Sequence, residues 1–200
     1  MKARQFRGVS DVYVAKVLTD NEEGITFDTP KRLCFTATVS KETSSDSATV
    51  YLDNKPMIVV SSEGADEITI TGSVIDLDVL AEIIGKTYDK DLDMLIDTER
   101  VPDYFAIGYV EGMTDGTKRY SFRYKGMFSI PGEEVNTADD GTDSTQQSLT
   151  FTGIMTEAKF EKAGNKGAKG IVVSDAKADV SDWFTAVKTP DEIVAKTPSA

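Results

Sequence analysis

The fold is decided by residues 49–85, which read TVYLDNKPMIVVSSEGADEITITGSVIDLDVLAEIIG. Apolar residues first recur at or near every second position, which is typical of half-buried strands. These positions are Val50, Leu52, Met57, Ile58, Val59, Val60, Ile68, Ile70 and Val74. After Ile75 the spacing changes to that of one helical face, formed by Val79, Leu80, Ile83 and Ile84. The stretch therefore predicts strand-like runs followed by one amphipathic helix.

The ends of this helix are marked by polar residues and a glycine. Asp76 or Asp78 can cap its start, because a carboxylate accepts hydrogen bonds from unpaired backbone N–H groups there. Gly85 can end it in the left-handed conformation. In a chain with so many strands, we expect the four apolar helix residues to cover a sheet face.

Length and composition limit the class of protein. Two hundred residues suffice for one well-cored domain with an appendage. No apolar run approaches the roughly 20 residues of a membrane span, and the N-terminal residues lack the apolar stretch of a signal peptide. Cys34 is the only cysteine, so no intrachain disulfide forms, and we expect it to be a buried apolar residue.

The net charge of −12 is unevenly distributed. Residues 1–7 carry three bases and no acid, and residues 159–200 carry seven bases and six acids, so residues 8–158 hold −16. Such a surface does not bind a polyanion by neutralising its charge.

The best hairpin joins residues 104–111 to residues 118–130 through Asp115-Gly116, a strong turn signal. In its second strand, one face is aromatic and the other basic. The aromatic face holds Tyr120, Phe122, Tyr124, Gly126 and Phe128, and the other holds Arg119, Ser121, Arg123, Lys125 and Ser129. Because aromatics and bases lie on opposite faces, the pattern favours an amphipathic strand over a site for single-stranded nucleic acid.

Two polar segments are expected to project from the body. Residues 40–48, SKETSSDSA, predict a loop whose candidate contact residues are Lys41, Glu42, Thr43, Ser44, Ser45 and Asp46. Residues 132–148 predict a second, acidic loop with Glu133, Glu134, Asp139, Asp140 and Asp143. Between the strands that follow the first segment, Asp53-Asn54-Lys55-Pro56 predicts a tight turn.

No pattern of catalysis or cofactor binding is present in the sequence. The chain has no histidine, which is the commonest general base and metal ligand, and it lacks nucleotide-binding and nucleophile-elbow motifs. Asp89, Asp91 and Asp93 alternate as in a calcium loop, but Met94 and Arg100 stand where an EF-hand needs Gly and Glu. We therefore predict no enzyme, no metal site and no cofactor.

Several segments together resemble one family. They are GVSDVYVAKV (8–17), TVYLDNKP (49–56), DLDVLAEIIG (76–85), PDYFAIGYVEGMTDGTKRYSFRYKGMFSIP (102–131) and QSLTFTG (147–153). Together they look like the major tail tube protein of long-tailed, siphovirus-type phages of Gram-positive bacteria. The resemblance covers about residues 6–160, and residues 1–160 would be the tail-tube domain with an N-terminal arm. Residues 161–200 would be a C-terminal extension with a linker, a strand near residues 169–175 and a short helix from Ser181.

The resemblance implies a mainly β fold, a β-sandwich or barrel-like structure with one flanking helix. It implies hexameric rings stacked into a tube through which DNA passes during ejection, with no sequence-specific binding. Tape measure, tail terminator and baseplate proteins would be the partners. The protein would be made in the host cytoplasm and would be located in the tail of the virion. Ring stacking is assigned to residues 40–48, and a second inter-subunit contact to residues 132–148.

Two other classes remain open on the sequence. One is a different β-sandwich virion component, such as a capsid decoration protein. The other is a carbohydrate-binding module, for which Tyr88, Tyr104 and Trp183 are the candidate exposed aromatics.

Overall fold

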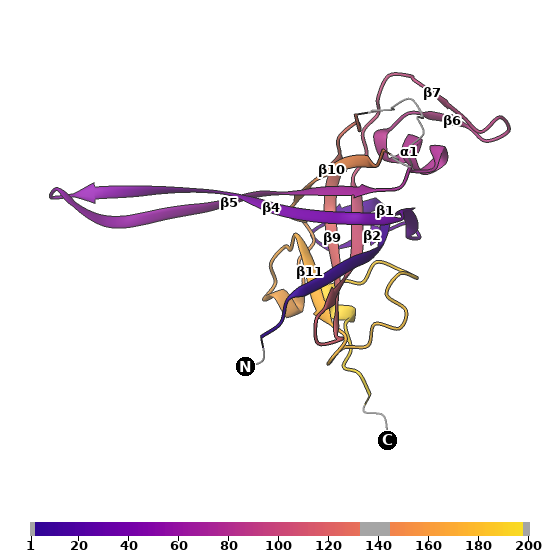
Figure 1. Ribbon diagram of the computed structural model, residues 1–200. Coiled ribbons are helices and arrows are strands. Elements are labelled where there is room, and N and C mark those ends of the chain that lie inside the picture. The colour runs from indigo at the N-terminus through magenta and orange to yellow at the C-terminus, as the bar shows by residue number, and fades with distance from the viewer. Residues whose placement is uncertain (1–2, 133–144, 198–200) are drawn as a thin grey trace.

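The computed structural model describes residues 3–132 and 145–197. These residues are mainly β with one α-helix, as predicted (Figure 1). The elements are β1 (Phe6–Asn21), β2 (Gly24–Phe27), β3 (Lys31–Cys34), β4 (Thr36–Leu52), β5 (Lys55–Gly72), α1 (Leu77–Ile84), β6 (Thr87–Asp89), β7 (Met94–Ile96), β8 (Phe105–Met113), β9 (Lys118–Phe128), β10 (Gln147–Ile154) and β11 (Gly170–Ser174), with short 3-10 turns at Glu161–Ala163 and Pro190–Glu192.

Nine of the strands form one antiparallel sheet. Its main order is β2-β1-β8-β9-β10-β5-β4, while β3 also pairs with β1 and β11 also pairs with β9. Strands β6 and β7 form a separate hairpin beside α1 (Figure 1). The predicted hairpin around Asp115-Gly116 is the β8–β9 pair.

Helix α1 begins and ends where the sequence predicts. Asp76 is the N-cap residue without a side-chain hydrogen bond, and Asp78 Oδ1 accepts one from the Val79 N–H at 2.8 Å. Gly85 has φ 70°, and a Cβ there would lie 2.0 Å from the Val101 carbonyl oxygen, so the C-cap requires glycine. The predicted core face, Val79, Leu80, Ile83 and Ile84, is buried, at 1–7% exposed.

The first core lies between α1 and one face of the sheet. Its sheet residues come from β1, β3, β5, β8, β9 and β10, which brings together segments distant in sequence. Phe128 of β9 packs between Phe105 and Phe151, with ring centroids 5.9 and 5.1 Å away. Cys34 is buried in this core, and burial raises the pKa of its thiol.

The C-terminal segment covers the opposite face and forms a second core. Trp183 stacks on Phe122 at 5.0 Å, and Phe160 lies 5.6 Å from Tyr124. Tyr124 also donates a hydrogen bond to the Lys188 carbonyl oxygen at 3.0 Å. The predicted strand is β11, which pairs with residues 119–123 of β9. Residues 161–197 are therefore packed on the sheet.

The helix predicted from Ser181 is wrong, because residues 181–186 form successive turns. Asp179 Oδ1 accepts hydrogen bonds from the Ser181 N–H at 3.0 Å and the Ser181 hydroxyl at 2.8 Å. These local bonds compete with helical backbone bonds. The segment nevertheless buries Trp183 and Val187 against the sheet.

A bulge in β9 also corrects the predicted division of its faces. Phe105 pairs with Gly126 and Ile107 with Arg123, so two residues of β8 oppose three of β9. Side chains beyond the bulge consequently change face, and Phe128 enters the first core while Phe122 enters the second. The middle of the basic face is withdrawn from solvent, because Lys125 is 9% exposed and the Arg123 side chain 14%, whereas Arg119 and Ser129 at its ends are exposed.

Candidate functional site: a projecting arm

The most distinctive feature of the molecule is a two-stranded arm. Strands β4 and β5 continue as a paired hairpin far beyond the other strands (Figure 1). We define the arm as residues 44–64, and every residue in this range is exposed. At 3.3 Å per residue, the eight residues from Ser45 to Leu52 alone extend about 26 Å. The arm thus reaches well past the body that carries it.

The arm corrects the prediction of a polar loop at residues 40–48. Lys41, Glu42 and Thr43 lie within the sheet opposite residues 66–68, whereas Ser44, Ser45 and Asp46 lie in the arm. From Ser44 onward, both faces of the β4–β5 hairpin are exposed to solvent, so apolar residues need not alternate with polar ones. Polar residues, including Thr43, suit a strand that has no core to cover.

The tip of the arm is a tight turn, as predicted. Asp53 and Asn54 both have positive φ, 50° and 57°. This is the two-residue geometry whose twist matches the strands of a hairpin. Pro56 follows on the next strand, where an exposed ribbon tolerates its missing N–H group.

The arm tip, residues 48–60, exposes an unusual amount of apolar surface. Its exposed large residues are Val50 (40%), Tyr51 (66%), Leu52 (50%), Met57 (65%), Ile58 (50%), Val59 (68%) and Val60 (56%). Val50 pairs with Ile58 and Ala48 with Val60, while Thr49 pairs with Val59, so both faces of the ribbon carry apolar side chains. An isolated hairpin is marginal in water, and contiguous exposed apolar patches mark interaction sites. The tip is therefore suited to contact with another protein surface.

At its root, the arm is held by a buried charge cluster around Asp66. This carboxylate is 2% exposed and accepts a hydrogen bond from the Thr43 hydroxyl at 2.8 Å. It also forms ion pairs with Lys41 at 3.3 Å, Lys169 at 3.3 Å and Arg123 at 3.7 Å. Burial opposes its ionisation, but the hydrogen bonds from Thr43, Lys169 and Lys41 prevail and lower the pKa of Asp66.

Lys169 connects the C-terminal segment to the arm root. Its ammonium donates to Glu63 Oε1 at 2.5 Å and to the Gly64 carbonyl oxygen. The strand register shifts between Thr43 and Ser45, and a Cβ on Gly64 would lie 2.2 Å from Ser44 Oγ. A larger residue at position 64 would require the Ser44 hydroxyl to rotate away. The irregularity and the lysine together fix the direction in which the arm leaves the body.

The other sequence-predicted site residues fall into two groups, those outside the described residues and those in the β6–β7 hairpin. Glu133, Glu134, Asp139, Asp140 and Asp143 lie outside the described residues. Asp89 and Asp93 lie in or beside the β6–β7 hairpin, where Asp93 accepts a hydrogen bond from Tyr88 at 2.7 Å. Across residues 3–132 and 145–197, no group of three or more His, Cys, Asp or Glu could hold a metal ion.

The candidate aromatics for carbohydrate binding are scattered. Trp183 is 2% exposed and belongs to the second core. Tyr104 is 42% exposed, but Lys125 lies over its ring at 5.0 Å. Tyr88 lies on a separate hairpin. The three rings therefore do not form one exposed sugar-binding platform.

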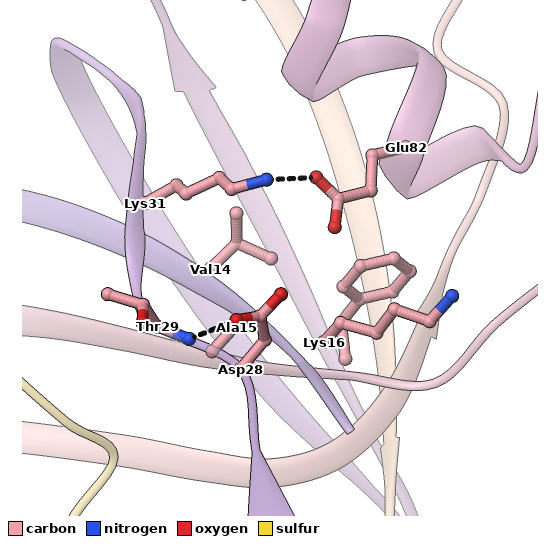
Figure 2. A pocket seen from close by; sticks show the side chains of 8 residues that line it. Val14, Ala15, Lys16, Asp28, Thr29, Lys31 and Glu82 are labelled. Carbon is pink, nitrogen blue, oxygen red and sulfur yellow. Dashed lines mark hydrogen bonds and ion pairs between the residues drawn. The ribbon is translucent and has the colours of Figure 1, made fainter. Parts of the chain in front are cut away.

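Figure 2 shows a small hollow where α1 meets the sheet. Val14, Lys16, Asp28 and Lys31 line it from the sheet side, and Glu82 from α1. Its volume of about 10 Å³ is about that of one water probe, too small for a ligand. The dashed line between Lys31 and Glu82 is a 2.7 Å ion pair that ties the helix to β3 and raises the pKa of Lys31. This hollow is therefore part of the packing between α1 and the sheet, and we do not assign it a ligand.

The sequence contained part of the signal for the arm. The Asp53-Asn54 pair predicts the turn, but the apolar residues beside it equally predict half-buried strands of the body. Polar segments on both sides, residues 40–47 and 61–67, indicated that this apolar run is separate from the core. The sequence contains no local pattern that predicts the charge cluster around Asp66, because the residues of this cluster come from β4, β5, β9 and the C-terminal segment.

Comparison with known proteins adds no identification. No protein-family model matches this sequence, and the search of curated proteins returns no match. Within residues 3–132 and 145–197, no helix has the length and apolarity required to cross a membrane.

Proposed function

We propose that this protein is a self-assembling structural subunit, the major tail tube protein of a long-tailed phage of Gram-positive bacteria. The observation that carries the proposal is the arm, whose tip exposes seven large apolar residues far from the core. Burying an apolar side chain completely contributes about 1.5–3 kcal/mol, and these residues are 40–68% exposed, so each would contribute about 1 kcal/mol on docking. Binding of a partner over this surface would therefore be favoured, because it removes the apolar side chains from water.

The arm supports the proposal of rings stacked into a tube. An arm that contacts a different surface on the next copy makes a heterologous interface, which closes into a ring or continues as a filament. In the proposed hexameric rings, the arm tip makes the axial contact between rings that the sequence analysis assigned to residues 40–48. The same contact repeats around each ring, so a small contribution per subunit multiplies over the assembly.

The charge of the body supports passage of DNA through such a tube. Residues 8–158 carry −16, and any of these acids on a lumenal wall would repel phosphate. DNA would then slide without the friction that each basic contact adds. In this proposal the tape measure, terminator and baseplate proteins bind the ends of the tube, and the protein belongs to the virion after synthesis in the host cytoplasm.

Electron microscopy of the purified protein tests the proposal. We expect rings or tubes at high concentration, and we expect Val59→Asp to remove them, because it places a charge in the contact surface of the arm tip. Val194→Asp is the matched control, since Val194 is 62% exposed outside the arm and Val59 is 68% exposed. A wild-type protein that stays monomeric at every concentration and forms no tubes in infected-cell lysates would contradict the proposal.

A further inference from the structure

A groove beside the arm root has the properties of a receiving site. It measures about 540 Å³ and lies between residues 6–9 of β1 and residues 37–41 of β4, with Tyr109 and Glu111 of β8. Phe6 on its rim is 62% exposed, and Val9 and Val39 are partly buried against the first core. The groove is therefore an apolar depression on the surface.

Both strands that border the groove have a free edge there. Among the described residues, β4 pairs with β5 alone, and residues 6–10 of β1 pair with β8 alone. The other partners of β1 lie further along it, at residues 12–14 for β3 and 17–21 for β2. An unpaired strand edge offers backbone N–H and C=O groups to an added strand. The groove thus combines apolar side chains with unused backbone hydrogen-bonding groups.

The charge around the groove contrasts with the acidic body. Arg119 lies over the Phe6 ring at 5.5 Å, and Lys41 lines the groove. Arg123 and Lys169 lie next to Lys41 in the root cluster. Against these four cations stand the carboxyls of Glu111, Asp66 and Glu63, which is paired with Lys169, so the region carries a formal +1. A docking partner should therefore be apolar and extended and carry no net positive charge.

We propose that this groove receives the arm tip of a second copy of the chain. The inference rests on the proposed function and names the surface that the arm engages. The arm tip carries Asp53 and Lys55 and is formally neutral, Asp46 beside it adds one negative charge, and the tip holds seven exposed large apolar residues. Each arm strand also has a free outer edge within the described structure, so the tip can add to β1 or β4 by backbone pairing. The tip and the groove lie on different parts of one chain, so the contact is heterologous.

A mixing experiment tests the groove directly. Val59→Asp disables the arm tip, and Ala37→Glu adds a carboxylate to the exposed surface of the groove. We expect each variant alone to self-associate on the order of a hundredfold more weakly than wild type. An equimolar mixture still has one intact tip and one intact groove, so sedimentation velocity should show a 1:1 heterodimer that grows no further. Ala176→Glu, in an exposed turn after β11, is the matched control and should assemble like wild type.

The outcomes separate this inference from the proposed function. Wild-type assembly that is unchanged by Ala37→Glu, or a mixture that stays monomeric, would overturn the groove as receiving site and leave assembly through the arm intact. A wild-type protein that never associates would overturn both. If the thermal transition of Ala37→Glu is lost, Phe6→Ser replaces it as the groove variant, because Phe6 is largely exposed. Its mixture with Val59→Asp should give the same heterodimer.

Discussion

Replacing Asp66 with asparagine tests whether the charge cluster stabilises the arm root. The amide preserves the shape of the side chain but removes the charge that Lys41, Arg123 and Lys169 surround. Breaking a buried ion pair by removing one partner costs about 3–5 kcal/mol, because an uncompensated charge stays buried. The Lys41 side chain is 30% exposed, which lets solvent screen part of this charge. We therefore expect the lower end, about 3 kcal/mol, and a fall in Tm of about 6–12 °C.

The assay is urea unfolding of wild type and Asp66→Asn at several pH values. Because the folded pKa of Asp66 is lowered from 3.8, its contribution is present above the unfolded pKa and is lost as the pH falls through the folded pKa. The difference between the two proteins should thus be full at neutral pH and shrink below pH 3.8. Asp46→Asn, on the exposed arm, is the control and should change the free energy of unfolding by less than about 0.5 kcal/mol. An Asp66→Asn variant within about 1 kcal/mol of wild type at neutral pH would refute the reasoning.

Three further changes probe the helix, the second core and the arm. Ile83→Asp should lower the free energy of unfolding by several kcal/mol, because Ile83 is 1% exposed and the charge would be buried unpaired; an unchanged Tm would show that the helix does not cover the sheet. Trp183→Ala should cost about 3–5 kcal/mol in urea unfolding, since Trp183 stacks on Phe122; a loss below 1 kcal/mol would mean that the C-terminal segment is dispensable for the fold. Replacing residues 47–60 with a short Gly-Ser turn should cost the fold about 1 kcal/mol or less, because all of them are exposed, yet abolish assembly in electron micrographs; tubes of normal length would contradict the role of the arm.

The parts of the fold that depend on local sequence were predictable. Helix α1 follows from the spacing of its apolar residues and from Gly85, and the arm turn follows from Asp53-Asn54. The β8–β9 hairpin follows from Asp115-Gly116. In each of these cases, residues within a few positions of one another determine the backbone, so a single sequence carries the signal.

The parts that depend on long-range contacts were not predictable. Alternating apolar residues indicate a strand but do not tell whether its faces meet a core or solvent, so the pattern predicts a half-buried strand at Val59, which is 68% exposed. The bulge in β9 reverses the face of Phe128 without any mark in the sequence. Asp66 and Lys169 are 103 positions apart, and their contact becomes visible only when the C-terminal segment is placed on the sheet.

The root of the arm links the stability of the subunit to its proposed assembly. A flexible arm would lose conformational freedom on docking, which reduces affinity, whereas an arm fixed by Asp66, Lys169 and Gly64 is already oriented. The same root cluster borders the groove through Lys41, so the position of one arm is fixed relative to the site that receives the next. A heterologous contact repeated at a fixed angle determines whether subunits close into a ring or continue as a filament. Loosening the root with Asp66→Asn should therefore broaden the distribution of assembled forms at temperatures well below the unfolding transition.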